Sequence, residues 1–282
     1  MKFYKENSQI FIPGIVEEEL ALNRTTHLAI AAHQDDIELM ALSGILECFA
    51  KADKHFTGVV TADGAGSPRN GLYKDYSDEQ MKATRIEEQK KAAVIGEYSA
   101  MVMLDYNSKE IKTPDNGNII DDYVKILKAT KPKFVYTHNL ADKHDTHVAV
   151  CIKVINAIRK LEDYEKPEKV YGCEVWRDLD WVQDDEKVVF DTSSHPNISN
   201  ALISVFDSQI VGGKRYDLAA AGRRTAHATY GASHGVDTAN SISYAMDLTP
   251  LVLDSKLDIV EYIVSYVKNF ENDIKDKINK LK

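Results

Sequence analysis

The sequence contains few cysteines and no long apolar segment. Its three cysteines, Cys48, Cys151 and Cys173, are an odd number and form no CxxC pair. This argues against a disulfide scaffold or a thiolate zinc site, and it predicts buried, neutral thiols. No apolar run approaches the ~20 residues of a membrane-spanning helix, and the N-terminal segment lacks the continuous apolar core of a secretory signal. We therefore expect a cytoplasmic protein without a membrane partner.

Positive charge is also scarce. Lysine and arginine together number 35 against 44 acidic residues, which gives a net charge of −9. A surface of this sign repels nucleic-acid backbones, and no basic, aromatic-rich patch offsets it, so we expect no nucleic-acid partner. What the 282 residues do contain, 44% hydrophobic and 28% charged side chains, is typical of a soluble globular protein. The length suits one large α/β domain or two small ones.

Short apolar runs alternate with longer amphipathic segments over the first two-thirds of the chain. The expected strands are residues 26–33, 56–63, 101–106, 133–138 and 170–176, and the expected helices are residues 35–51, 77–97, 118–131 and 145–162. Strands separated by helices require crossover connections, and strands that are apolar throughout require cover on both faces. The pattern therefore predicts an α/β fold with a mostly parallel central sheet between helices.

The pattern becomes looser after residue 180. Residues 187–193 predict a strand, residues 197–211 and 214–230 predict helices, and residues 230–241 predict a loop. The last segment, residues 255–282, has apolar residues at helical spacing and predicts a long amphipathic helix. No repeat or linker interrupts the chain, so we expect a single domain over residues 1–282, with a core at about 26–180 and a C-terminal elaboration at about 181–282. We also expect a homo-oligomer.

Polar residues gather where the first predicted strand ends. His33, Asp35 and Asp36 follow it within four residues, before a helix begins. Open parallel sheets place their ligand sites at the carboxyl ends of strands. His33 and Asp36 can converge on one cation, and Asp35 between them can point toward water at that cation. The alternative is helix initiation, with Asp35 as the N-cap and Glu38 completing a capping box, but it leaves His33 without a role.

A second polar cluster follows the strand predicted at residues 133–138. His144 and His147 stand three residues apart at the start of the next helix, so they share one face and can reach one centre. The alternative is a helix capped by Asp145 or Thr146, with both histidines on the solvated surface. Both clusters lie at the same edge of the predicted sheet. Two histidines and one aspartate leave a fourth position open for water, as catalytic zinc sites do.

These motifs resemble those of the LmbE-like, or PIG-L, zinc-dependent N-deacetylases. The segment His33-Gln34-Asp35-Asp36-Ile37-Glu38 resembles the family signature AHPDDxE, and His144-Asp145-Thr146-His147 resembles the later HPDH element. Between them, VTADGAG (60–66) and the helix containing Arg85-Ile86-Glu87-Glu88 are also similar to family segments. The match covers about residues 26–155 in the right order, and in the C-terminal third only SYAMDLTPL is similar.

The resemblance implies a Rossmann-like, three-layer α/β/α fold and a role for each matching residue. It implies that His33, Asp36 and His147 are metal ligands, that Asp35 is the general base, and that His144 stabilises the transition state. Zinc is the implied ion, and Fe²⁺ or Co²⁺ suits the same His₂Asp donor set.

Three departures from the family pattern concern the loops around this site. Gln34 replaces a proline, which affects loop rigidity more than chemistry. Asp145 and Thr146 replace Pro-Asp between the two histidines, which removes an expected support of the metal ligands. Ser108 stands where the family has an acidic residue, so sugar recognition there is expected to differ.

Candidate substrate-binding residues carry weaker signals. Arg69, in the loop at residues 64–71, could hold a sugar hydroxyl or a phosphate, or be solvated on a mobile surface loop. The basic cluster at residues 212–224 fits a solvated helix face or a subunit contact better than an anion site. Its cations are Lys214, Arg215, Arg223 and Arg224. We expect Trp176 in the core, and leave Trp181 open between the core and a sugar-stacking wall.

The favoured function is a metal-dependent hydrolase that removes the acetyl group from an N-acetylated amino sugar of the N-acetylglucosamine type, or from its conjugate. Zinc-activated water would attack, with Asp35 as general base. The alternative is a catalytically inactive sugar-binding protein of the same fold, which the intact polar residues argue against. A nucleotide-binding Rossmann protein is set aside, because HQDDIE stands in place of GxGxxG and its carboxylates would repel a pyrophosphate.

Overall fold

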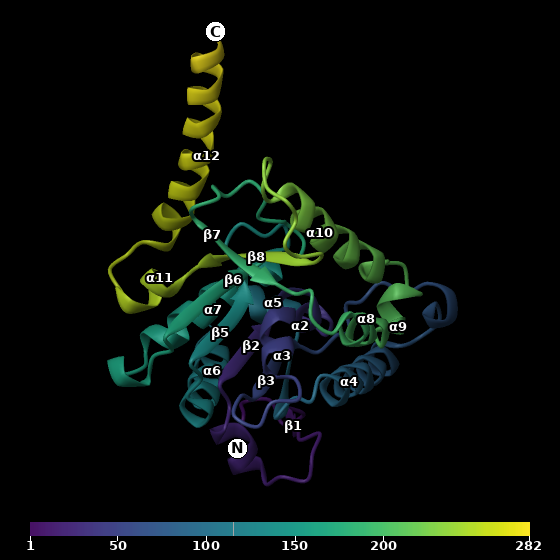
Figure 1. The fold of residues 1–282 in the computed structure, drawn as a ribbon. Helices are drawn as coiled ribbons and strands as arrows, with labels where there is room; N and C mark the ends of the chain where they lie inside the picture. Colours follow the sequence, from purple (N-terminus) through teal and green to yellow (C-terminus); the bar gives the residue numbers. More distant parts are fainter. Residues whose placement is uncertain (115) are drawn as a thin grey trace.

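One mixed, mostly parallel sheet of eight strands organises the chain (Figure 1) within the described residues, which in this computed structural model are 1–114 and 116–282. The strand order is β1-β4-β3-β2-β5-β6-β8-β7. The strands are β1 (Gln9–Phe11), β2 (His27–Ala31), β3 (Phe56–Ala62), β4 (Ala100–Tyr106), β5 (Phe134–His138), β6 (Lys169–Cys173), β7 (Lys187–Asp191) and β8 (Ile242–Asp247). The central run from β4 to β6 is parallel, while β1, β7 and β8 pair antiparallel. The predicted α/β architecture is confirmed.

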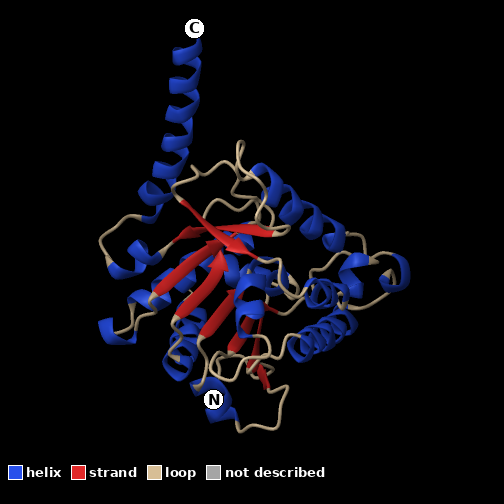
Figure 2. Ribbon diagram, viewed as in Figure 1, coloured by secondary structure: helices blue, strands red, loops and turns tan. Residues whose placement is uncertain are grey.

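Helices cover both faces of this sheet, as Figure 2 shows. They are α1 (Glu18–Asn23), α2 (Asp36–Met40), α3 (Leu42–Cys48), α4 (Asp78–Ile95), α5 (Ser108–Lys112), α6 (Gly117–Thr130), α7 (Asp145–Arg159), α8 (Pro196–Ser204), α9 (Asp207–Ile210), α10 (Tyr216–Tyr230), α11 (Thr249–Leu253) and α12 (Ile259–Leu281), with short 3₁₀ turns η1 (Gly71–Tyr73) and η2 (Asp163–Glu165). One apolar core includes α6, α7 and α11, and the other includes α2, α3, α4 and α8. The sheet therefore separates two cores, as strands apolar on both sides require.

Six strands lie where apolar runs predict them, but two predicted helices are each divided in two. Residues 35–51 form α2 and α3 because Ala41 leaves the helical region at φ −110° and ψ 21°. The break lets α3 approach the sheet closely: a Cβ on Gly44 would lie 2.8 Å from the ring of Tyr136. Residues 197–211 form α8 and α9. Phe206 lies between the two helices, and its ring is buried.

The order of the strands brings two distant loops together. After β2 the chain builds β3 and β4 on one side, then returns to place β5 and β6 on the other. Because β2 and β5 are parallel neighbours, the loops at their carboxyl ends meet at a topological switch point, where open α/β sheets bind ligands. His33 follows β2, and His144 follows β5.

The C-terminal helix α12 projects away from the rest of the molecule (Figure 1). Its first turns pack on the core through Ile259, Tyr262 and Ile263, and Trp181 contacts Phe270. Apolar residues of α12, among them Val264, Val267 and Ile274, are exposed. The homo-oligomer stays a prediction. No helix within the described ranges is both long enough and apolar enough to span a bilayer.

The cysteines behave as the sequence predicts. Cys48, Cys151 and Cys173 are all buried free thiols. Burial raises the pKa of Cys48 to about 12 and raises those of the other two as well. All three are therefore neutral at physiological pH, and none is an activated nucleophile.

Candidate metal centre

The loop after β2 has a strained backbone that turns its aspartates inward. Asp35 has φ 88° and ψ −30°, a conformation that non-glycine residues rarely adopt. Its backbone N–H donates to Gln89 Oε1 at 3.3 Å, but its carboxylate forms no cap on α2. Glu38 instead accepts hydrogen bonds from Gln89 and Tyr98. The helix-capping interpretation of Asp35 and Glu38 is therefore wrong.

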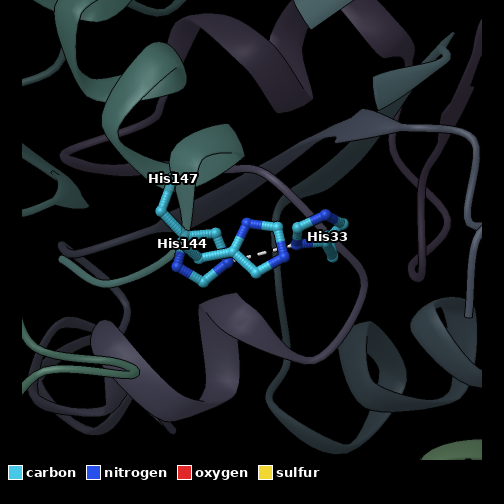
Figure 3. A group of neighbouring side chains, drawn as sticks. All are labelled: His33, His144 and His147. Atoms are coloured by element: carbon cyan, nitrogen blue, oxygen red, sulfur yellow. Dashed lines mark hydrogen bonds between the residues drawn. The ribbon is translucent and has the colours of Figure 1, made fainter. Parts of the chain in front are cut away.

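The loop after β5 ends at a histidine that caps the next helix. His144 is the N-cap of α7, and its Nδ1 accepts the backbone N–H of Thr146 at 3.2 Å. This replaces the predicted cap by Asp145 or Thr146. Since Nδ1 is the acceptor, the proton of the neutral ring lies on Nε2. Figure 3 shows His144 and His147, from the start of α7, facing His33 from the other loop.

Three donor atoms from the two loops converge on one point. His33 Nδ1 lies 3.1 Å from Asp36 Oδ2 and 3.2 Å from His147 Nε2. The third side of the triangle, from His147 Nε2 to Asp36 Oδ2, is 3.3 Å. Ligand atoms at zinc–nitrogen and zinc–oxygen bond lengths around a tetrahedral ion lie roughly 3.3 Å apart. The spacing and the His₂Asp donor set therefore fit a zinc ion that has an open fourth position.

Two further histidines lie close to these donors. Ligand atoms of Asp36, His138 and His147 also lie within 4.8 Å of one another, as do those of His33, His144 and His147. However, His138 Nε2 already accepts the backbone N–H of Ala32 at 2.9 Å, and Nδ1 of His144 is engaged at the helix cap. Among the described residues, neither His33 Nδ1 nor His147 Nε2 accepts a backbone N–H in this way. We therefore favour His33, Asp36 and His147 as the metal ligands.

His138 carries no signal in the sequence that separates it from an ordinary strand residue. It ends β5, is fully buried, and stacks on His147 with ring centroids 3.9 Å apart. Burial, followed by the neighbouring His147, lowers its pKa well below the usual value, although Asp36 opposes the shift. His138 is therefore a neutral ring that packs against a metal-ligand candidate and holds the end of β2.

Asp142 lies next to the candidate metal ligand His147. Its Oδ2 lies 3.5 Å from His147 Nδ1, on the side of the ring away from Asp36. Backbone N–H groups of His144 and Trp176 donate to the two carboxylate oxygens. A carboxylate behind a ligating histidine fixes its tautomer and raises its basicity. Where Asp145 and Thr146 replace Pro-Asp, Asp142 is therefore the carboxylate placed to support His147, from earlier in the loop.

The electrostatics of the cluster favour a positive charge at its centre. Burial opposes protonation of His147, yet the carboxylates of Asp36 and Asp142 raise its pKa to about 10. Burial would raise the pKa of Asp36, but the imidazoles of His147 and His138 hold it well below its usual range. A proton or a metal cation can satisfy this demand, and a cation satisfies all three converging lone pairs at once.

The spare carboxylate, Asp35, is paired with an arginine from α4. Arg85 Nη2 lies 3.2 Å from Asp35 Oδ2, and Arg85 also donates to the Gln34 carbonyl and to Ser67. Burial raises the pKa of Asp35 well above its ordinary value, although Arg85 opposes the shift. The sequence shows Arg85 only as part of a family-like helix; its contact with Asp35 depends on the tertiary structure.

A cavity of about 360 Å³ opens over the cluster. It is lined by His33, Asp35, Asp36 and His144 of the cluster, by Asp63, Gly64 and Ser67 after β3, and by Ser108 at the start of α5. Trp176, Gln209, Lys214 and Tyr216, from the C-terminal part of the chain, complete the wall. Gln209 and Tyr216 escaped prediction because no local pattern links them to the motifs 60 or more positions earlier.

Most of the candidate substrate-binding cations have partners elsewhere. Arg69 is not among the described residues that line the cavity; it donates to Ala65 O at 2.9 Å and pairs with Asp78. Arg224 is buried and donates to the carbonyls of Glu38 and Leu39. Arg223 likewise donates to the carbonyls of Val175 and Trp176, and Arg215 pairs with Asp217.

Lys214 and the two tryptophans differ in where they lie relative to the cavity. Lys214 lines the cavity, with Nζ 5.0 Å from the ring centroid of Trp176. Trp176 is only half-buried and lies at the cavity wall, so the prediction of a core position is wrong in part. Trp181 packs against Phe270 of α12 and is not among the described residues around the cavity.

The fold and this cluster define an α/β protein with a candidate His/Asp metal centre at the switch point of its sheet. Residues 28–158 match the family model described as PIG-L: GlcNAc-PI de-N-acetylase. Over this segment, a little under half of the chain, the sequence is similar to the PIG-L, or LmbE-like, family. A comparison with curated proteins finds no match.

Solved structures share the fold at low sequence identity. GalB, the 4-carboxy-2-hydroxymuconate hydratase from Pseudomonas putida KT2440, is 19% identical, with a TM-score of 0.62 over 79% of this chain and 96% of that one. The N,N'-diacetylchitobiose deacetylase from Pyrococcus horikoshii is 16% identical, with a TM-score of 0.59 over 78% and 83%. The A40926 pseudoaglycone deacetylase Dbv21 is 13% identical, with a TM-score of 0.57 over 80% and 97%. Since a hydratase and deacetylases share this fold, the reaction must be argued from the site.

Proposed function

We propose that this protein is a zinc-dependent hydrolase that removes the acetyl group from an N-acetylated amino sugar of the N-acetylglucosamine type, or from its conjugate. The observation that carries the proposal is the convergence of His33 Nδ1, Asp36 Oδ2 and His147 Nε2 within 3.1–3.3 Å of one another. The match of residues 28–158 to the PIG-L family model and the deacetylases among the structural matches support amide hydrolysis.

The chain supplies a complete set of ligands for the proposed ion. His33, Asp36 and His147 supply the ligands, and Asp142 orients His147 from behind. When bound, a zinc ion polarises an amide carbonyl and lowers the pKa of a coordinated water toward ~7. Fe²⁺ or Co²⁺ offers the same chemistry to this donor set. The backbone N–H of His33 donates to Asp36 Oδ2 at 2.7 Å, which fixes the carboxylate before any ion binds.

Asp35 is the proposed general base. Its carboxylate lies at the cavity base beside Asp36 but outside the ligand triangle. Because burial raises its pKa, its affinity for a proton is greater than that of an exposed carboxylate. It accepts the proton of the attacking water and returns it to the departing amine, while Arg85 keeps the carboxylate in place.

His144 is the proposed hydrogen-bond donor to the oxyanion. Burial, with the neighbouring His147 and His33, lowers its pKa to about 4, so the ring is neutral at physiological pH. Because its Nδ1 accepts from Thr146, the donor is Nε2–H. A neutral donor of this kind stabilises developing negative charge, and removing one typically costs on the order of 10²–10³ in turnover.

A two-part experiment tests the proposal. Metal content is measured on the purified protein, and the zinc-loaded enzyme is then assayed for amine release from N-acetylglucosamine, its phosphates and its glycosides. We expect about one divalent ion per chain and release of acetate and free amine in equal amounts. A protein that binds the ion but hydrolyses none of these amides contradicts the proposal and favours the inactive sugar-binding alternative.

A further inference from the structure

A second pocket adjoins the cavity over the metal centre. It has a volume of about 240 Å³ and shares Trp176, Lys214 and Tyr216 with that cavity. The rings of Trp176 and Tyr216 meet edge to face, with centroids 6.2 Å apart. Trp176 also lies 6.4 Å, between ring centroids, from His144. A molecule bound at the metal centre can therefore extend past these rings into the second pocket.

Helix α10 builds one wall of this pocket, and two of its lining residues are alanines. Tyr216, Ala219, Ala220 and Arg223 recur at three- and four-residue spacing, so they lie on one face of the helix. The alanines leave space that a larger side chain would fill. Leu39 and Val175 contribute further apolar surface opposite. Almost all of this pocket lies outside residues 28–158, the segment that matches the family.

Four charged side chains around the pocket already have partners within the protein. Arg224 donates to the carbonyls of Glu38 and Leu39, and Glu174 accepts the backbone N–H groups of Leu179 and Tyr244. Arg223 donates to the carbonyl of Val175, and Arg215 pairs with Asp217. Groups that are satisfied internally gain little from a polar ligand, whereas the apolar lining gains from losing contact with water.

We propose that this pocket is a subsite for an apolar aglycone, so that the substrate is an N-acetylated amino sugar that carries an alkyl or aryl group. The inference rests on the proposed deacetylase function. Two of the lining residues, Lys214 and Ala219, are exposed, which suits a substituent that continues out of the enzyme. An apolar cavity of ~150 Å³ holds a benzene ring in a protein interior, so this pocket accepts an aryl or short alkyl group.

Matched glycosides test the subsite directly. Methyl and phenyl glycosides of N-acetylglucosamine are compared as substrates of the zinc-loaded enzyme. We expect kcat/KM for the phenyl glycoside to exceed that for the methyl glycoside at least ~10-fold, because a buried ring removes apolar area from water. A third substrate, the methyl glycoside of N-butyrylglucosamine, places the added carbons on the acyl group instead. We expect it to show no such gain.

Two substitutions on adjacent residues of α10 provide the structural control. Ala220 lines the pocket, whereas Ala221 is exposed and points away from it. We expect Ala220→Phe to bring the phenyl and methyl glycosides within ~2-fold of each other, because the added ring fills the subsite. Ala221→Phe is expected to keep the full preference. Equal unfolding midpoints of the two variants would confirm that both fold.

The outcomes separate this inference from the proposed function. Hydrolysis of both glycosides with equal kcat/KM, or a phenyl preference that Ala220→Phe leaves intact, overturns the subsite and leaves the deacetylase standing. A gain for the N-butyryl substrate alone assigns the pocket to the acyl group and likewise overturns the proposal. If neither glycoside is hydrolysed, the function fails, and calorimetry on the same protein decides the subsite: it is also overturned unless the phenyl glycoside binds ~10-fold more tightly.

Discussion

The two parts of the chain that meet at the cavity differ in what they contribute. The family-like segment, residues 28–158, provides every ligand candidate, the spare carboxylate and the histidine donor. The later segment provides Trp176, Gln209, Lys214 and Tyr216, which form walls and contact no ligand candidate within hydrogen-bond distance in the described chain. Under the proposed function, the first part sets the chemistry, and the second sets which molecules reach it.

The largest effect is expected when a metal-ligand candidate in residues 28–158 is removed. We expect Asp36→Asn to lose the metal and to reduce kcat/KM by ~10³-fold or more for every substrate, because its carboxylate completes the donor triangle. Metal analysis and amine release are measured on the same sample. Asp145→Asn, an exposed neighbour of the second loop, is the control and should keep both. A fully metallated, active Asp36→Asn variant would exclude Asp36 as a ligand.

Removing the base separates chemistry from metal binding within the first part. We expect Asp35→Asn to keep its ion and lose about 10³-fold in turnover, because the amide cannot accept the proton of water. The measurement is single-turnover amine release alongside metal stoichiometry. Full activity with the metal in place would remove Asp35 from the mechanism.

A smaller effect is expected from the residue behind His147. Asp142→Asn should weaken metal affinity ~10–100-fold, since the carboxylate no longer fixes the His147 ring. Competition with a chelator measures this affinity. Unchanged affinity in a folded variant would show that Asp142 serves only the backbone N–H groups of His144 and Trp176.

A substitution in the segment after residue 158 should change KM and not the metal content. We expect Trp176→Ala to raise KM for sugar substrates by ~10-fold while metal content stays the same, because the ring lines both cavities but holds no ligand. Trp181→Ala is the matched control, since Trp181 contacts Phe270 of α12 instead. A loss of metal in Trp176→Ala would contradict the division between the two parts.

The smallest expected effect concerns stability and pH. Burial raises the pKa of Glu38 from 4.5 to about 7, despite hydrogen bonds from Tyr98 and Gln89. Because the folded protein holds this proton more tightly, its contribution to stability is complete below pH ~4.5 and is lost as the pH rises through about 7.

We expect Glu38→Gln, which stays neutral, to raise the Tm relative to the native protein by about 5 °C at pH 8 and by little at pH 5. The exposed Glu79→Gln is the control. An equal shift of the Tm at both pH values would exclude titration of Glu38 as the cause.

The sequence predicted the parts of the site that local chemistry marks. His33, Asp36 and His147 follow the ends of apolar strands, so the rule that parallel sheets bind ligands at this edge locates them without coordinates. His138 is different, because a histidine at the last position of a buried strand is indistinguishable from any other strand residue. Asp142 is a polar residue in a polar loop, and only its distance to His147 gives it a role.

Tertiary packing determined what the sequence left open. The division of residues 35–51 into α2 and α3 accompanies a close contact between Gly44 and Tyr136, and a helical pattern in the sequence does not show that contact. The basic cluster at residues 212–224 looked like a solvated face, but Arg223 and Arg224 satisfy carbonyl groups far away in sequence. Tyr216, at the start of α10, and Lys214 just before it line the cavity, and α10 packs beside β8.

The central claim is that two loops, one after β2 and one after β5, hold a single ion between them. Anomalous diffraction from crystals of the zinc-loaded protein tests it most directly. We predict one peak per chain, bonded at ~2.0–2.1 Å to His33 Nδ1, His147 Nε2 and Asp36 Oδ2. A peak bonded to residues of only one loop, or no peak at this cluster while zinc binds elsewhere, would contradict the account.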